Sequence, residues 1–230
     1  MAIYHDNRDD ANKAMNALKT LADDGNVHAM YHFADLADLA DLTMKTDYYH
    51  MAATKGHFGA TIQVGGLYLE GRGVEKNPST AAEWYKNAYD MAMDRGNPND
   101  IASDAMDALK TLADDGNVDA MYYLATRLFE NALIITIGEN ETLTMAVKYY
   151  RMAAMEGHCG ATIQLGDLYL EGRGVEKNSS MAKEWYQKAY EKANEDCNFE
   201  LAVDLLDHMT QNLENETPTP YFYTEQCCRM

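Results

Sequence analysis

The feature that most constrains this chain is an internal duplication. The segment AMNALKTLADDGNVHAMY, which begins at Ala14, returns as AMDALKTLADDGNVDAMY from Ala105, at an offset of 91 residues. Further along the chain the offset becomes 101, and LYLEGRGVEKN occurs letter for letter at 67–77 and 168–178. The extra residues of the second copy lie around 132–142, where we expect a loop or an extended helix end. Because self-similarity at a fixed period is typical of stacked repeats, the duplication predicts a repeat architecture.

The spacing of small and aromatic residues predicts helices throughout and almost no strand. Ala146, Tyr150 and Ala153 are four and three residues apart, which places them on one face of a helix. Glycines that precede an alanine by four residues are expected to end helices in the left-handed conformation; they are Gly25, Gly56, Gly116 and Gly157. The expected helices span 8–24, 28–41, 43–55, 59–70, 78–95, 99–115, 118–131, 142–156, 159–170 and 179–196, with an eleventh near 198–213.

The duplication also sets the expected domain organisation. It divides the chain into a first repeat block at 1–96, a second repeat block at 97–213 and a non-repeat tail at 214–230. Five helices per block cannot repeat in a strictly alternating solenoid, so the junction at 94–100 is either a break or a place where one helix serves two neighbours. The tail contains prolines and aromatics without a helical period, which makes it a candidate for self-association.

Charge and composition exclude several classes of partner. Nineteen Lys and Arg residues against 37 Asp and Glu give a formal net charge of −18, which repels phosphate backbones and anionic lipids. We therefore expect neither nucleic acid nor a membrane as partner, and ALIITI at 132–137 is too short to span a bilayer. The four cysteines form no C-x-x-C pattern, so we expect reduced thiols, a cytoplasmic location, no metal and no cofactor.

Several longer words of the sequence resemble the Sel1-like repeat family, which is related to the tetratricopeptide solenoids. These words are AAEWYKNAYDMA, MAKEWYQKAYEKA, GHFGATIQVGGLYLEGRGVEKN and GHCGATIQLGDLYLEGRGVEKN, and the resemblance covers roughly residues 8–213. It departs from the family at Asn77 and Asn178, which replace the usual Asp, and the two LADDGN segments lack an aromatic doublet. The resemblance implies an all-α fold, a right-handed α-solenoid of antiparallel helix pairs. It also implies a non-enzymatic adaptor or scaffold that binds a peptide or protein on its concave surface.

The duplicated glycine loop is interpreted as a structural turn. Gly71, Gly73, Gly172 and Gly174 follow an amphipathic helix and precede EKN. A phosphate-binding loop would instead follow a strand and open a helix with Lys and Ser or Thr. We therefore expect these glycines to reverse the chain and to bind no nucleotide. We also expect Asn77 with Ser79, and Asn178 with Ser179, to cap the next helix.

Histidines provide the other candidate chemistry. His28 and His32 are four residues apart, the spacing of a two-histidine metal edge, but no third ligand accompanies them. His57 and His158 follow the capping glycines, where we expect their side chains to meet free carbonyls at a helix end. The sequence contains no local Ser/His/Asp, Cys/His or paired-acid arrangement, so we predict no catalytic residues and no enzymatic activity.

Four aromatic doublets are the candidate binding features. Adjacent helix residues point about 100° apart, so if the second member packs in the core, the first faces a neighbouring repeat or the inner groove. These first members, the candidate partner-binding residues, are Tyr48, Trp84, Tyr149 and Trp185. Buried packing and partner recognition both remain open for them. The phasing predicts that Tyr85 and Tyr186 are more buried than Trp84 and Trp185.

A second functional reading rests on charge instead of groove shape. An acidic inhibitor or immunity-type protein would neutralise a basic enzyme through its net charge of −18. Salt separates the two readings, because electrostatic attraction between exposed charges weakens steeply with ionic strength.

Overall fold

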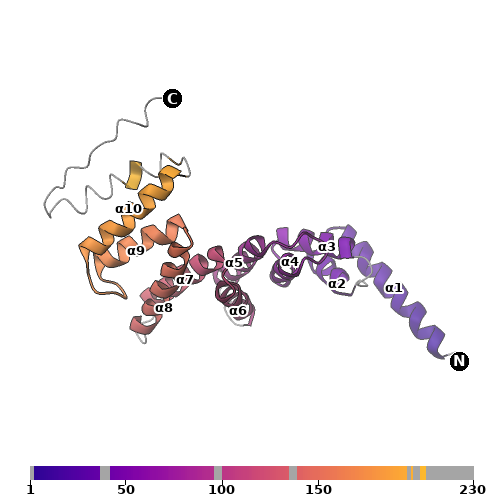
Figure 1. Ribbon diagram of the computed structural model, residues 1–230. Helices are drawn as coiled ribbons and strands as arrows, with labels where there is room; N and C mark the ends of the chain where they lie inside the picture. Colours follow the sequence, from indigo (N-terminus) through magenta and orange to yellow (C-terminus); the bar gives the residue numbers. More distant parts are fainter. Residues whose placement is uncertain are drawn as a thin grey trace. The chain divides into compact units, whose positions relative to one another are not determined.

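The chain is helical throughout the part that the structure describes. The computed structural model describes residues 3–36, 42–95, 100–134, 139–195, 198 and 203–205. Within these ranges it contains no strand, so the fold is all-α, as the three-and-four spacing predicts (Figure 1). The helices are α1 (Ile3–Asp23), α2 (Val27–Leu36), α3 (Leu42–Thr54), α4 (Phe58–Glu70), α5 (Pro78–Asp94), α6 (Asp100–Asp114), α7 (Val118–Ile134), α8 (Glu139–Met155), α9 (Cys159–Glu171) and α10 (Ser179–Glu195).

The expected eleventh helix and the tail fall largely beyond these ranges. Residues 203–205 are helical and belong to the segment expected near 198–213. The tail at 214–230 lies outside the described residues, as does most of the junction at 94–100. Around the expected insertion, α7 continues to Ile134 and α8 begins at Glu139, so the described part of 132–142 forms helix ends.

The capping glycines adopt the conformation that the sequence predicts. Gly25 has φ +95°, its N–H donates to the carbonyl of Ala22, and the N–H of Asn26 donates to the carbonyl of Leu21. These bonds satisfy the last carbonyls of α1 while the left-handed residue turns the chain. The three other predicted caps also have positive φ; they are Gly56, Gly116 and Gly157.

Side chains cap the starts of the helices. Asn77 and Asn178 cap α5 and α10, as predicted, and their Oδ1 atoms accept backbone N–H bonds at 3.1 and 3.0 Å. The expectation for His57 and His158 was wrong, because they cap the N-termini of α4 and α9 instead of meeting free carbonyls. Each accepts a backbone N–H through Nδ1, at 3.2 and 3.1 Å. The turn between the two helices is so short that the residue directly after the capping glycine is the N-cap of the next helix.

Consecutive helices pack against one another from α1 to α7 and again from α8 to α10, which gives the packed helix pairs of a solenoid fold. The chain divides into two compact units, Met1–Thr136 with α1 to α7 and Ile137–Met230 with α8 to α10. The cores are rich in alanine, and the largest fully buried side chains include Tyr49, Tyr150 and Tyr186. Small residues let helices approach closely while tyrosine rings fill the spaces between pairs.

α5 packs against both α4 and α6, as the other interior helices of the first unit pack against both of their neighbours. The block boundary in the sequence therefore lies inside the first compact unit. The unit boundary lies instead between α7 and α8. Sequence copies and compact units are thus different divisions of this chain.

Candidate protein-interaction surface

The second member of each tested doublet is the more buried one, which confirms the predicted helix phasing. Tyr85 and Tyr186 are 5% and 0% exposed. Trp185 is 9% exposed and Trp84 is half-buried. The alanine stripes therefore do mark the core face of these helices.

Two glycines inside helices make room for these tyrosines. A Cβ atom at Gly65 would lie 2.8 Å from Cε1 of Tyr85, and one at Gly166 would lie 2.5 Å from Cε1 of Tyr186. Real Cβ contacts are longer, so only glycine admits the rings at these positions. This role was not predicted from the sequence, although a glycine inside a helical pattern, away from any cap, indicates a close packing contact.

The hydroxyl of Tyr186 also has a defined partner. It donates a hydrogen bond of 2.5 Å to Oδ1 of Asp167. Burial, followed by this contact with the carboxylate, raises the pKa of Tyr186 above its usual range. The residue equivalent to Asp167 in the first block is Gly66, so the first block lacks this acceptor.

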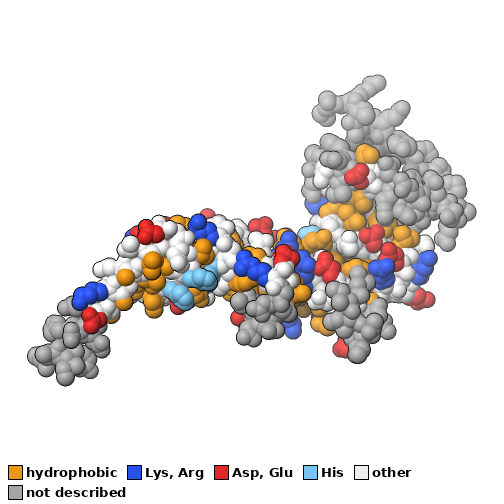
Figure 2. Space-filling view, turned by 180° about the vertical axis from the view of Figure 1, so that it is seen from behind, with side chains coloured by type: hydrophobic (Ala, Val, Ile, Leu, Met, Phe, Trp, Pro, Cys, Tyr) orange, Lys and Arg blue, Asp and Glu red, His pale blue; other side chains and the backbone are white. Residues whose placement is uncertain are grey.

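Histidines gather on the first unit beside hydrophobic side chains (Figure 2). The rings of Tyr31 and His57 are stacked at 4.4 Å, and His28 meets His57 edge-on at 5.2 Å. Burial, followed by repulsion from His28 and His32, lowers the pKa of His57. Among the described residues, no three His, Cys, Asp or Glu side chains are placed to hold a metal ion.

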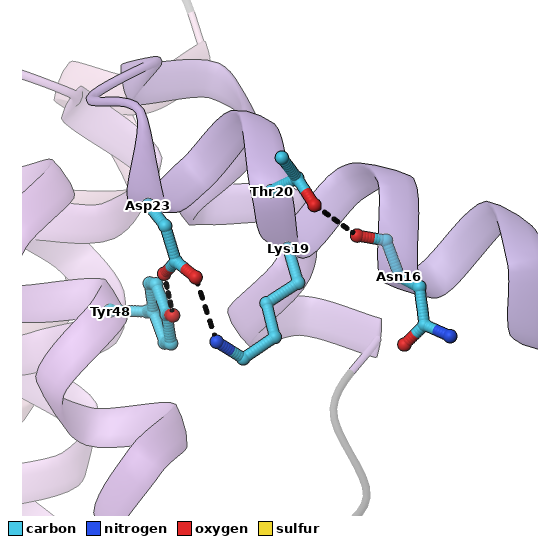
Figure 3. Close-up of polar contacts among 5 residues, drawn as sticks. All are labelled: Asn16, Lys19, Thr20, Asp23 and Tyr48. Atoms are coloured by element: carbon cyan, nitrogen blue, oxygen red, sulfur yellow. Dashed lines mark hydrogen bonds and ion pairs between the residues drawn. The ribbon is translucent and has the colours of Figure 1, made fainter.

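Tyr48, a candidate binding residue, belongs to a packed corner between α1 and α3 (Figure 3). Its side chain is buried, and its ring meets Phe33 edge-on at 4.8 Å. Its hydroxyl donates to Asp23, whose other oxygen accepts from Nζ of Lys19 at 2.8 Å. The hydrogen bond from Lys19, followed by that from Tyr48, lowers the pKa of Asp23. Tyr48 therefore fixes α1 to α3 and offers no open ring to a partner.

Trp84 is the candidate that keeps an accessible face. Its ring meets His50 edge-on at 5.4 Å, and His50 meets Tyr68 edge-on at 5.7 Å. The three residues come from α5, α3 and α4 and are all half-buried. Burial lowers the pKa of His50, which favours the neutral imidazole. We call His50, Tyr68 and Trp84 the aromatic patch.

The equivalent residues of the second block are arranged differently. Arg151 replaces His50, and its Nη2 donates to the hydroxyl of Tyr169 at 2.9 Å. Trp185 is buried, and Nζ of Lys188 lies 4.2 Å from its ring centre. Among the described residues, Nε1 of Trp185 has no hydrogen-bond partner. Tyr149 is buried as well. Three of the four candidate residues are therefore buried, and Trp84 is the one that is partly exposed.

The glycine loops close against the preceding helix pair. All four turn glycines have positive φ; they are Gly71, Gly73, Gly172 and Gly174, with φ of 73°, 72°, 77° and 67°. A Cβ atom at Gly174 would lie 3.0 Å from the carbonyl oxygen of Leu143 at the start of α8. The loop thus needs glycine for its conformation and also for its close approach to a neighbouring helix.

The comparisons with known proteins agree with this architecture. The family model for the Sel1 repeat matches residues 60–93, 118–158 and 160–194. These three stretches of the chain are similar to Sel1 repeats. Each match covers most of two consecutive helices: α4 with α5, α7 with α8, and α9 with α10.

Sel1-repeat proteins of known structure are among the similar folds. A Sel1 repeat protein from Oxalobacter formigenes is 22% identical, with 86% of this chain and 59% of that chain covered and a TM-score of 0.40. Immunity protein Pa5087 from Pseudomonas aeruginosa is 22% identical over 85% of this chain and 89% of that chain, with a TM-score of 0.34. These likenesses concern the fold.

A relative with an assigned name comes from rat. DAP3-binding cell death enhancer 1 of Rattus norvegicus is 29% identical, with 67% of this chain and 32% of the relative covered. This chain therefore spans about a third of that relative's length. In the described part of this chain, no helix combines the length and the apolar character needed to cross a bilayer.

Proposed function

We propose that this chain is a non-enzymatic adaptor that binds a peptide or protein on the concave surface of its repeats, at the aromatic patch. Sel1-repeat proteins generally mediate interactions between proteins and are generally non-enzymatic. The observation that carries the proposal is the partly exposed ring of Trp84, which meets His50 edge-on while His50 in turn meets Tyr68.

The chemistry of the patch favours an extended segment with flat or cationic side chains. Trp and Tyr rings provide large contact areas with few rotatable bonds, so binding orders little of the protein. Neutral His50 adds no repulsion toward Lys or Arg, and the net charge of −18 attracts basic segments at long range. A basic side chain over the Trp84 ring would form a cation–π contact.

The test is affinity capture with matched variants of the full chain. Trp84→Ala removes the accessible ring, whereas Met93→Ala changes an exposed apolar residue nine positions later on α5, near the opposite side of the helix. Proteins that bind the patch should be captured by the wild type and by Met93→Ala, with at least about a tenfold loss for Trp84→Ala. Equal capture by both variants contradicts the assignment of the patch.

Net charge supports a second candidate, an acidic inhibitor or immunity-type protein that neutralises a basic enzyme. Such a complex would tolerate Trp84→Ala but would lose affinity steeply between about 50 and 500 mM salt, because exposed charges are screened over that range. Binding to the aromatic patch predicts the reverse pattern, in which Trp84→Ala matters and salt matters little.

A further inference from the structure

Two helices of this chain have almost the same sequence but opposite exposure. The C-terminal half of α1 and that of α6 share the word ALKTLADDGN, at an offset of 91 residues. In α6, Leu112 is 2% exposed, whereas its equivalent in α1, Leu21, is 50% exposed. Ala105 is fully buried, and its equivalent Ala14 is exposed. Since the residues are the same, the difference comes from what each helix packs against.

The neighbour that buries α6 is α5. Ala88, Tyr89 and Ala92 of α5 form one core cluster with Ala102 and Ala105 of α6. The contact is a stripe of small residues with one tyrosine, which lets the two helix backbones approach closely. α1 packs against α2, just as α6 packs against α7. The side of α1 that corresponds to the α5-facing side of α6, however, is exposed.

α7 completes the surface that holds α5. Arg127 of α7 forms an ion pair of 2.9 Å with Asp90, and its guanidinium lies over the ring of Tyr89 at 5.7 Å. Nζ of Lys86 lies 4.9 Å from the ring centre of Tyr123. α5 is therefore held by apolar contacts to α6 and by cationic contacts that involve α7.

α2 differs from α7 at both positions that carry these contacts to α5. His32 replaces Tyr123, and Leu36 replaces Arg127. Leu36 is 61% exposed, which is unusual for a leucine whose neighbours in α2 belong to the core. We call the surface of α6 and α7 that contacts α5 the α5 seat. The open surface of α1 and α2 is thus similar to the α5 seat but is apolar where that surface carries Arg127. Figure 1 shows α1 and α2 next to each other at the N-terminal end of the first unit.

We propose that α1 and α2 form a docking surface for an amphipathic helix of the α5 type. The internal contact of α5 with α6 and α7 defines its chemistry: two small residues four positions apart, a tyrosine next to the first, and an uncharged residue at the position of Asp90. An acid there would lose its partner, because Leu36 stands in place of Arg127. This surface consists of other residues than the aromatic patch and does not depend on its function.

The probe is a fluorescently labelled peptide with the sequence of α5, Pro78–Asp94, and the same peptide with Asp90→Leu. Fluorescence anisotropy with the full chain should show that the Asp90→Leu peptide binds at least about tenfold more tightly than the native peptide. A peptide of this length is marginally helical alone, and its folding cost cancels where protein variants are compared for one and the same peptide.

Three variants of the full chain decide the outcome. Leu21→Asp, at a half-exposed site, should weaken binding of the Asp90→Leu peptide by at least about tenfold. Leu36→Arg recreates the cation of the α5 seat and should reverse the preference, so that the native peptide becomes the tighter ligand. Met155→Asp, at an exposed apolar site in the second unit, is the matched control and should leave both affinities unchanged.

Other outcomes overturn the proposal. A peptide that binds wild type and Leu21→Asp equally has entered another site, such as the seat of α5 itself. Absence of binding by both peptides rejects an α5-type helix as the occupant. If neither peptide binds but sizing chromatography shows self-association that Leu21→Asp abolishes, the surface is instead a contact between two copies of this chain.

Discussion

Two adjacent glycines in α4 should respond in opposite ways to the same substitution. Gly65 and Gly66 both lie in the helix interior, where alanine is favoured over glycine by about 0.5–1 kcal/mol. A Cβ atom at Gly66 would lie 3.7 Å from the hydroxyl of Tyr85, an ordinary contact. A Cβ atom at Gly65 would lie 2.8 to 3.0 Å from three ring atoms of Tyr85. The neighbouring position thus provides the control for the helix preference.

The magnitudes follow from these contacts. Gly66→Ala should stabilise the protein by about 0.5–1 kcal/mol, the helix preference alone. Gly65→Ala gains the same preference, but the buried ring of Tyr85 must move, and overpacking of a filled core costs about 1–3 kcal/mol. The difference between the two variants isolates the overpacking cost, because propensity and unfolded-state effects cancel. We expect Gly65→Ala to be the less stable variant by about 1–3 kcal/mol.

Urea unfolding followed by circular dichroism at 222 nm measures this difference. The midpoint should rise for Gly66→Ala and fall for Gly65→Ala, with equal slopes if both unfold between the same states. Gly166→Ala tests the same contact in the second block, where the gap to the Tyr186 ring is 2.5 Å and the ring is fully buried. Equal stabilisation by Gly65→Ala and Gly66→Ala would refute the reasoning, because it would mean that Tyr85 does not press against α4.

Three further predictions concern packing, a hydrogen bond and pH. Leu112→Ala should cost about 2–5 kcal/mol and Leu21→Ala about 1 kcal/mol or less, in urea unfolding, because the first creates a cavity and the second changes a half-exposed side chain. Gly66→Asp introduces the residue found at the equivalent position of the second block, Asp167. It should stabilise the protein by about 0.5–1.5 kcal/mol if its carboxylate accepts a hydrogen bond from the hydroxyl of Tyr85. No gain in stability over Gly66→Ala argues against that hydrogen bond. Folding lowers the pKa of His57 below 6.5. The contribution of neutral His57 to the free energy of unfolding is therefore complete above pH 6.5 and is lost as the pH falls through the pKa of the folded state. Because Asn caps a helix without titrating, His57→Asn should make stability depend less on pH between about 7 and 5, and an unchanged pH dependence contradicts the role of the cap.

Local patterns predicted most of the fold. Helix ends, capping glycines and the asparagine caps follow from residues within one or two turns of each other, and the structure confirms them. The order of burial within the doublets was predictable too, since Tyr85 continues a stripe whose spacing is visible in the sequence. Interactions of this range are encoded by spacing alone.

What the sequence could not supply depends on which helix lies opposite. The role of Gly65 requires that the ring of Tyr85 lies against it, and no local pattern states this. The burial of Tyr48 depends on Phe33 and Asp23, which belong to two other helices. The sequence also could not predict that Leu21 differs from its equivalent in α6, because the segments around the two leucines are almost identical.

The contrast between α1 and α6 shows how one block can stack on another. Each block begins with a helix, α1 or α6, and one side of that helix is not covered by the other helices of its own block. In the second block that helix is α6, and the last helix of the first block, α5, covers it. The first block contains the same helix as α1, whose corresponding face is open. The contact of α5 with α6 therefore joins the two blocks, and the corresponding face of α1 stays apolar and exposed, so that a further helix of the α5 type can continue the stack there.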